Sequence, residues 1–200
     1  MAGLVLYGTP SKQFTPLSAG SHVSRCFSVV DLGTQQSEYL GTKRSQQKLR
    51  VSFEVPDELT EDGKPMVVSR NFTASLHENS KFREFLMGWR GRDFTDGELK
   101  RFELKAILGK PAILTIVHQE RDGKVYANLD RVAPLLKGQT APDPVNESIW
   151  FDLTNFDQST YEKLSKYVQE TIAKSPEFQQ YVGNAFSSSH IENEDEEIPF

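Results

Sequence analysis

The stretch from Pro111 to Val132 constrains the fold most strongly, because it predicts a β-hairpin. Two segments rich in β-branched residues, PAILTIVHQE and KVYANLDRV, lie on either side of the dipeptide Asp122-Gly123. Asp-Gly readily adopts the positive φ angles of a type I′ turn, whose twist suits a tight connection between antiparallel strands. The sequence therefore predicts two adjacent antiparallel strands in this part of the chain.

Three segments further upstream also have strand patterns. The segment VSRCFSVVDL, residues 23–32, is rich in β-branched and aromatic residues. In KLRVSFEV, residues 48–55, apolar and polar residues alternate, which predicts a half-buried strand with a partly basic outer face. The segment MVVSRNFTASL, residues 66–76, predicts a third strand, whereas the polar stretch 33–47 between the first two is expected to be a loop.

Residues 78–91, ENSKFREFLMGWRG, have the pattern of an amphipathic helix. Apolar residues recur at spacings of three and four, Asn79 or Ser80 can cap the N-terminus, and Gly88 or Gly91 can end the helix. A second short helical segment is expected within DGELKRFELKAILG. Five strands with one helix between the third and the fourth are the order expected for an OB-type barrel. We therefore expect a mainly β (α+β) fold, with a five-stranded OB-fold barrel over residues 21–140.

The segments outside this barrel have different patterns. Residues 1–20 are rich in Gly, Pro, Ser and Thr and indicate an N-terminal arm. Residues 141–183 hold a Pro-containing linker and the segment DQSTYEKLSKYVQETIAKS, whose apolar stripe predicts a C-terminal helix. This helix packs either on the barrel or on a second copy, which leaves a monomer and a homodimer open. Residues 184–200 lack a core-forming pattern and are strongly acidic near their end, so we expect a disordered acidic tail.

The charge of the chain is divided unevenly between its two parts. Residues 1–140 hold 20 Lys and Arg against 16 Asp and Glu, whereas residues 141–200 hold 3 against 12. The body is therefore mildly basic although the formal net charge of the chain is -5. An acidic tail beside a basic body could compete with a polyanion for that body.

The composition is typical of a globular protein of the cytoplasm, with 37% hydrophobic and 26% charged residues. No apolar run approaches the roughly 18 residues that cross a bilayer, and the first residues lack a secretory pattern. The single cysteine, Cys26, cannot form an internal disulfide, and its apolar surroundings favour a small core residue. We therefore expect a cytoplasmic protein that does not contact a membrane.

Patterns for catalysis, for a metal or for a cofactor are missing from the sequence. The stretches GTPSK, GTKRS and LGKPA do not supply the G-x-x-x-x-G-K-[ST] spacing of a phosphate-binding loop. The four histidines lack metal-ligand spacing, no second cysteine is present, and no G-x-S-x-G motif occurs. We therefore expect no catalytic residue, no metal, no cofactor and no enzymatic activity.

Cations and aromatic residues occur together on the expected strands and on the loop before the second strand. Such a mixture is what nonspecific binding of single-stranded nucleic acid requires, because cations contact phosphates and bases stack on aromatic faces. The candidate DNA-binding residues are Lys43, Arg44, Lys48, Arg50, Arg70, Phe72, Trp89, Arg90, Arg92, Lys124 and Tyr126. Phe72 and Trp89 can also be core residues, and Lys43 and Arg44 can also be solubility charges. Tyr126 has the opposite strand parity to its apolar neighbours, which favours an exposed ring.

The chain ends in EDEEIPF, and this ending resembles the C-terminal tip of bacterial single-stranded-DNA-binding proteins. In that family the tip recruits replication, recombination and repair proteins. The resemblance implies a protein-interaction tip that consists of Asp195, Glu196, Glu197, Ile198, Pro199 and Phe200. The acidic residues can approach a basic rim while Ile198 and the Phe200 ring enter an apolar pocket and the terminal carboxylate meets a cation.

The body is similar to the single-stranded-DNA-binding proteins of tailed bacteriophages, especially in LGKPAILTIVHQERDGKVYANLDRVAPL and YEKLSKYVQETIAKSPEF. This resemblance extends loosely over residues 20–180 and implies an OB-fold and sequence-independent binding of single-stranded DNA. It also implies a role in phage DNA replication or recombination in the cytoplasm of a bacterial host, with phage or host proteins as partners of the tip. Two alternatives remain open, namely an adaptor that binds mainly protein and has weak DNA affinity, and an enzyme or nuclease subunit with an unrecognised site.

Overall fold

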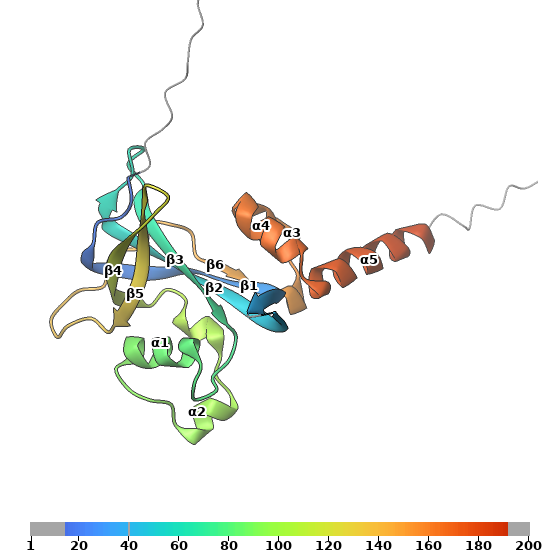
Figure 1. Cartoon of the computed structure of the whole chain (residues 1–200), viewed down its shortest axis with the longest axis horizontal. Helices are drawn as coiled ribbons and strands as arrows, with labels where there is room; N and C mark the ends of the chain where they lie inside the picture. The colour runs from blue at the N-terminus through green and yellow to red at the C-terminus, as the bar shows by residue number, and fades with distance from the viewer. Residues whose placement is uncertain (1–14, 40, 192–200) are drawn as a thin grey trace, which may run out of the picture.

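The computed structural model of the chain describes residues 15–39 and 41–191. Within these residues it contains a six-stranded sheet and several short helices, so the expected mainly β architecture is confirmed (Figure 1). Five strands follow one another in the order β3-β2-β1-β4-β5 with antiparallel neighbours, and β6 pairs parallel with β1. The strands are β1 (Gly20–Tyr39), β2 (Thr42–Leu59), β3 (Pro65–Thr73), β4 (Pro111–Arg121), β5 (Lys124–Ala133) and β6 (Ile149–Phe151).

The β4–β5 hairpin has the turn that the sequence predicts. Asp122 and Gly123 connect the two strands with φ angles of 51° and 69°. Two consecutive positive φ angles are the signature of a type I′ turn. Arg121 lies opposite Lys124, so the ladder continues to the turn itself.

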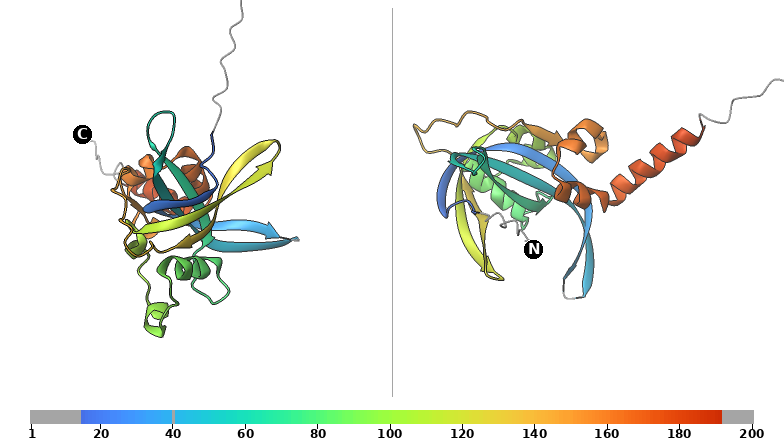
Figure 2. Two further views of the ribbon diagram at one scale, coloured as in Figure 1. Left: turned by 90° about the vertical axis from the view of Figure 1, so that its left-hand side faces the viewer. Right: turned by 90° about the horizontal axis from the view of Figure 1, so that it is seen from above.

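β1 and β2 form a second hairpin that is longer than the sequence predicts. The polar stretch 33–47 was expected to be a loop, but its residues 33–39 and 42–47 continue the two strands, and Gln36 for example lies opposite Ser45. Antiparallel strands pair through their backbone groups, so strands that are largely exposed can pair without alternating apolar side chains. This stretch therefore showed no strand pattern in the sequence. Figure 2 shows this hairpin, in blue to cyan, and the β4–β5 hairpin, in yellow, projecting from the same side of the molecule.

β3 and β5 approach each other at the two open edges of the sheet. No backbone ladder joins them in the part of the chain that the structure describes. Instead, the Arg70 guanidinium on β3 donates hydrogen bonds to the carbonyl oxygens of Leu129 and Asp130 on β5, with N···O distances of 3.0 and 3.1 Å. The sheet is therefore open along this edge, and one side chain bridges the gap.

The main core lies between the inner face of the sheet and helix α1 (Lys81–Arg90). Phe53 of β2 is fully buried, and its ring centroid lies 6.2 Å from that of Phe85 and 5.0 Å from that of Trp89. Cys26 is fully buried in the same core, as its sequence context predicts. Burial raises the pKa of the Cys26 thiol to about 12, so this side chain is an uncharged core residue.

The ends of α1 follow the capping pattern of the sequence. The Ser80 hydroxyl accepts a hydrogen bond from the Phe82 N–H at the N-terminus, and Gly91 ends the helix with a φ of 67°. The second helical segment that the sequence predicts is divided into a short helix α2 (Asp96–Lys100) and a 3-10 turn η1 (Leu104–Ile107). These elements lead the chain from α1 to β4.

The C-terminal part forms a second layer on the outer face of β1. Its elements after β6 are η2 (Leu153–Asn155), α3 (Gln158–Lys163), α4 (Lys166–Ala173) and α5 (Pro176–Ile191). Val30 and Leu32 of β1 belong to the same buried cluster as Val168 and Ile172 of α4. The helical segment therefore packs on the sheet of its own chain, which is one of the two arrangements that the sequence left open.

The single helix expected over residues 157–175 is divided between α3 and α4. Leu164 and Ser165 have ψ angles of 151° and 150°, so the backbone is extended at this point. The Gln169 side-chain amide donates hydrogen bonds to the carbonyl oxygens of Leu164 and Tyr161, at 2.8 and 3.2 Å. This amide satisfies carbonyl groups that lose their helical partners at the break.

Helix α5 projects away from the body of the molecule (Figure 1). It begins at Pro176, a favoured first position because the missing N–H of proline would have no helical partner there. The helix continues past residue 184, where the sequence predicts the acidic tail to begin. The expected interaction tip, residues 195–200, and most of the expected N-terminal arm, residues 1–14, lie outside the described residues.

Candidate nucleic-acid interface

The outer faces of β2 and β3 together form a polar surface, which we call the β2–β3 face. It consists of Lys48 and Arg50 on β2 and of Ser69, Asn71 and Thr73 on β3, whereas Ser52 and Glu54, which have the same parity on β2, are buried. The apolar residues that alternate with them on β2 point into the main core, as the sequence predicts. In the ladder, Lys48 lies opposite Thr73 and Arg50 lies opposite Asn71.

The two cations of the β2–β3 face are held by neutral partners. The Lys48 ammonium donates hydrogen bonds to the Thr73 hydroxyl at 2.7 Å and to the Gln46 side-chain oxygen at 2.9 Å. The Arg50 guanidinium donates to the Asn71 side-chain oxygen at 2.9 Å. Burial lowers the pKa of the Lys48 ammonium and that of the Arg50 guanidinium, because both groups are partly removed from water.

Within the described residues, neither Lys48 nor Arg50 forms an ion pair with a carboxylate. Arg83, Arg101 and Lys163, in contrast, each pair with an acidic side chain. A phosphate group would supply the missing negative charge and form charge-assisted hydrogen bonds with both cations of the face.

Further candidate residues lie on the two projecting hairpins. Lys43 and Arg44 are exposed near the tip of the β1–β2 hairpin, and Arg44 has the same strand parity as Lys48, so it continues the basic row. On the other hairpin, Lys124 is exposed next to the turn and Tyr126 is 46% exposed. The exposed ring that parity predicts for Tyr126 is therefore present, on a hairpin that projects from the same side as the first (Figure 2).

Phe72 and Arg70 on β3 point toward the core side of the sheet. Phe72 is only 4% exposed, and its ring centroid lies 4.7 Å from that of Phe85 and 5.2 Å from that of Phe82. Of the two roles that the sequence left open, Phe72 therefore has the core role, and its ring offers no free face to a base. Arg70 lies with its guanidinium carbon 5.2 Å from the centre of the Phe72 ring and bridges to β5.

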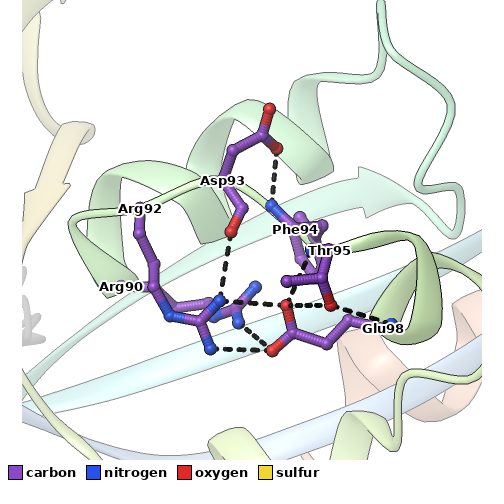
Figure 3. Close-up of polar contacts among 6 residues, drawn as sticks. All are labelled: Arg90, Arg92, Asp93, Phe94, Thr95 and Glu98. Carbon is purple, nitrogen blue, oxygen red and sulfur yellow. Dashed lines mark hydrogen bonds and ion pairs between the residues drawn. The ribbon is translucent and has the colours of Figure 1, made fainter.

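The cluster around Trp89 is also directed away from the β2–β3 face. Trp89 is 6% exposed in the main core, where its indole N–H donates to the carbonyl oxygen of Pro111 at 2.8 Å. Arg90 and Arg92 both form ion pairs with Glu98 of α2, and the Arg92 contacts measure 2.8 and 3.0 Å (Figure 3). Hydrogen bonds from Arg92 and from the Thr95 N–H hold the pKa of Glu98 at about 2. The two arginines therefore share one carboxylate, whereas Lys48 and Arg50 pair with none among the described residues, so Arg90 and Arg92 have less to gain from a phosphate.

The sequence did not identify several side chains that belong to the interface. Gln46, Asn71 and Thr73 position the two central cations, but polar residues on an outer strand face carry no distinctive sequence signal. Tyr167 of α4 lies with its ring centre 5.9 Å from the Arg50 guanidinium carbon. Tyr167 directly precedes the buried Val168 and does not belong to the apolar stripe of the helix. This position in the sequence was the signal that could have predicted an exposed ring.

The interface contains hydrogen-bond donors, uncompensated cations and exposed tyrosines, which suits a flexible polyanion with aromatic bases. The described residues include no group of three or more His, Cys, Asp and Glu side chains that could hold a metal ion. None of the helices at residues 15–39 and 41–191 has the length and apolar character needed to span a bilayer. A comparison of the chain with protein-family models and with curated protein sequences finds no match.

Proposed function

We propose that this chain is a sequence-independent single-stranded-DNA-binding protein with an OB-type fold. It coats and protects single-stranded DNA during phage DNA replication or recombination in the host cytoplasm, and its C-terminal tip recruits phage or host proteins. The observation that carries the proposal is the β2–β3 face, on which Lys48 and Arg50 have only neutral partners among residues 15–39 and 41–191.

The arrangement of the strands supports the OB-type assignment. In OB folds, the face of strands 2 and 3 and the loops 1–2 and 4–5 bind oligonucleotides. The same elements carry the uncompensated cations and the exposed Tyr126 in this chain. The helix α1 lies between β3 and β4, and the gap between β3 and β5 is bridged by Arg70 in place of a ladder. A partly open barrel of this type is within the OB pattern.

Binding without sequence preference follows from the chemistry of these groups. Lys48 and Arg50 contact phosphates, which are the same for every sequence. A tyrosine ring stacks on any base, because every base has an aromatic face. No residue of the β2–β3 face is required to read the edges of the bases.

The proposal is tested by titrating a fluorescent oligo-dT with the full chain at several salt concentrations. The double variant Lys48→Gln/Arg50→Gln is compared with Arg101→Gln/Lys105→Gln, which removes the same two charges from exposed positions outside the face. Loss of two charge-assisted contacts is expected to weaken binding by about tenfold or more. The slope of log K against log salt should decrease by about 1.4, since each phosphate on a single strand contributes about 0.7.

Other outcomes of this titration would contradict the proposal. If the wild-type chain does not bind oligo-dT at low salt, an adaptor that binds mainly protein becomes the better interpretation. If both double variants weaken binding equally, DNA affinity arises from net charge and the β2–β3 face has no special role. Degradation of the oligonucleotide in the presence of a divalent metal would point to a nuclease.

A further inference from the structure

Helix α4 places an exposed aromatic ring beside the β2–β3 face. Val168 and Ile172 of this helix are buried against β1, with 6% and 0% exposure, so burial fixes the position of the helix. Tyr167 lies just before Val168 and is 61% exposed. Single exposed aromatic residues are common on protein surfaces and do not by themselves indicate a binding site. The side chains around Tyr167 therefore determine whether it belongs to one.

The decisive neighbour is Arg50, which extends from β2 between β3 and α4. One side of its guanidinium donates to the Asn71 side chain at 2.9 Å, and its central carbon lies 5.9 Å from the centre of the Tyr167 ring. Arg50 is half-buried and forms no ion pair with a carboxylate in the described part of the chain. Its position is therefore fixed before a ligand arrives, which lowers the entropy lost on binding.

The two other exposed tyrosines whose side chains the structure describes, Tyr126 and Tyr181, lack this combination. The ring centroid of Tyr181, on α5, lies 4.2 Å from that of Phe156, so a neighbouring aromatic ring already packs against it. Tyr126 is exposed on the β4–β5 hairpin, and no cation of the described residues lies over its ring. Tyr167 is therefore the better candidate for a ring that takes a base while a phosphate binds next to it.

We propose that Tyr167 and Arg50 form a nucleotide subsite for single-stranded DNA at the junction of α4 with the β2–β3 face. A base stacks on the exposed face of the Tyr167 ring, and the phosphate next to that base binds the Arg50 guanidinium. The C-terminal helical layer is then one wall of the DNA-binding surface as well as a cover for β1. This subsite rests on the proposed function, because it requires the DNA to follow the β2–β3 face.

The test compares oligo-dT with an abasic strand of equal length, which has the same phosphates but no bases. In the full chain, Tyr167→Leu removes the aromatic ring and Tyr167→Phe retains it. Tyr167→Leu should weaken binding of oligo-dT by about tenfold, since stacking is lost, and leave binding of the abasic strand unchanged. Tyr167→Phe should bind like the wild type, whereas Arg50→Gln should weaken binding of both strands.

A fluorescence measurement provides a direct readout of stacking. Oligo-dT should quench the tryptophan fluorescence of Tyr167→Trp more strongly than that of the wild type, because a base stacks on the added indole. The abasic strand should cause no such additional quenching. The matched control is Tyr181→Trp, which adds an indole on α5 and should show no additional quenching.

The possible results separate the subsite from the proposed function. If the wild type binds oligo-dT in a salt-sensitive way but Tyr167→Leu binds equally well, the subsite is wrong and the proposed function stands. If Tyr167→Leu loses equal affinity for oligo-dT and for the abasic strand, Tyr167 only positions Arg50. The proposed stacking of a base on this ring is then wrong. If the wild type binds neither strand, the proposed function is wrong and the subsite is wrong with it.

Discussion

Gly33 lies where β1 packs closely against Ser175 and Leu153 of the C-terminal layer, and its replacement by alanine tests how that layer is attached. Its φ is 68°, and a Cβ at this position would lie 2.5 Å from the Cβ of Ser175 and 2.8 Å from Cδ1 of Leu153. Ser175 is fully buried between α4 and α5, so it has no free space into which it could move. Gly33→Ala therefore introduces backbone strain and a steric clash together.

A second glycine separates these two contributions. Gly41 has a φ of 75°, similar to that of Gly33, but a Cβ there would have no atom within 4 Å. For Gly41→Ala we expect a loss of about 1 kcal/mol, because left-handed strain is partly offset by the lower entropy of the unfolded chain. For Gly33→Ala the clash adds about 1–3 kcal/mol, which gives a total loss of about 3 kcal/mol.

The assay is urea unfolding of both variants and the wild type, followed by circular dichroism and by tryptophan fluorescence. In a thermal melt, about 3 kcal/mol corresponds to a decrease in Tm of about 6–12 °C for a chain of this size. If Gly33→Ala is no less stable than Gly41→Ala, β1 and the α4–α5 junction are not packed as closely as the structure indicates, and the reasoning is refuted.

Two further predictions concern acidic side chains. Glu54 is fully buried and accepts hydrogen bonds from Val145 and Asn146, so Glu54→Ala should cost about 3 kcal/mol or more in a urea titration. Replacement of the exposed Glu61 should cost less than about 0.5 kcal/mol, and equal losses would contradict the role of Glu54. In the folded protein the pKa of Glu98 is about 2, whereas its ordinary pKa is 4.5. The ion pairs of Glu98 therefore stabilise the fold fully above pH 4.5, and this stabilisation is lost as the pH falls through about 2. Thermal melts of Glu98→Gln and the wild type should therefore converge toward pH 2, and a difference that does not change with pH would contradict this prediction.

Local chemistry explains which parts of the fold could be predicted from the sequence. Asp122-Gly123 specifies its turn through backbone preferences of the two residues themselves, and Ser80 and Gly91 delimit α1 in the same way. The alternation in residues 48–55 predicted which side chains of β2 face the core. In each case, residues adjacent in the sequence determine the structure.

The remaining features depend on contacts between distant segments. Burial of Trp89 and Phe72 depends on how α1 packs against the sheet, and strand parity alone does not show which face is covered. Arg90 and Arg92 have the composition of a DNA-binding cluster, but both form ion pairs with Glu98 once α2 folds next to α1. The break at Leu164 depends on packing against β1, which the helical period of the segment does not reveal.

The C-terminal segment also explains how an acid can lie in the basic row of β2. Glu54 has the same strand parity as Lys48 and Arg50 and would repel a polyanion if it were exposed. Its carboxylate instead accepts hydrogen bonds from the Val145 N–H and from the backbone and side-chain amides of Asn146, at 3.2, 2.7 and 2.8 Å. These donors, which lie just before β6, satisfy the hydrogen bonding of the buried carboxyl group, so the part of the row that solvent reaches is the end with Lys48 and Arg50. The segment that covers Glu54 continues into α4, so one stretch of chain both shields this acidic side chain from solvent and places Tyr167 beside Arg50.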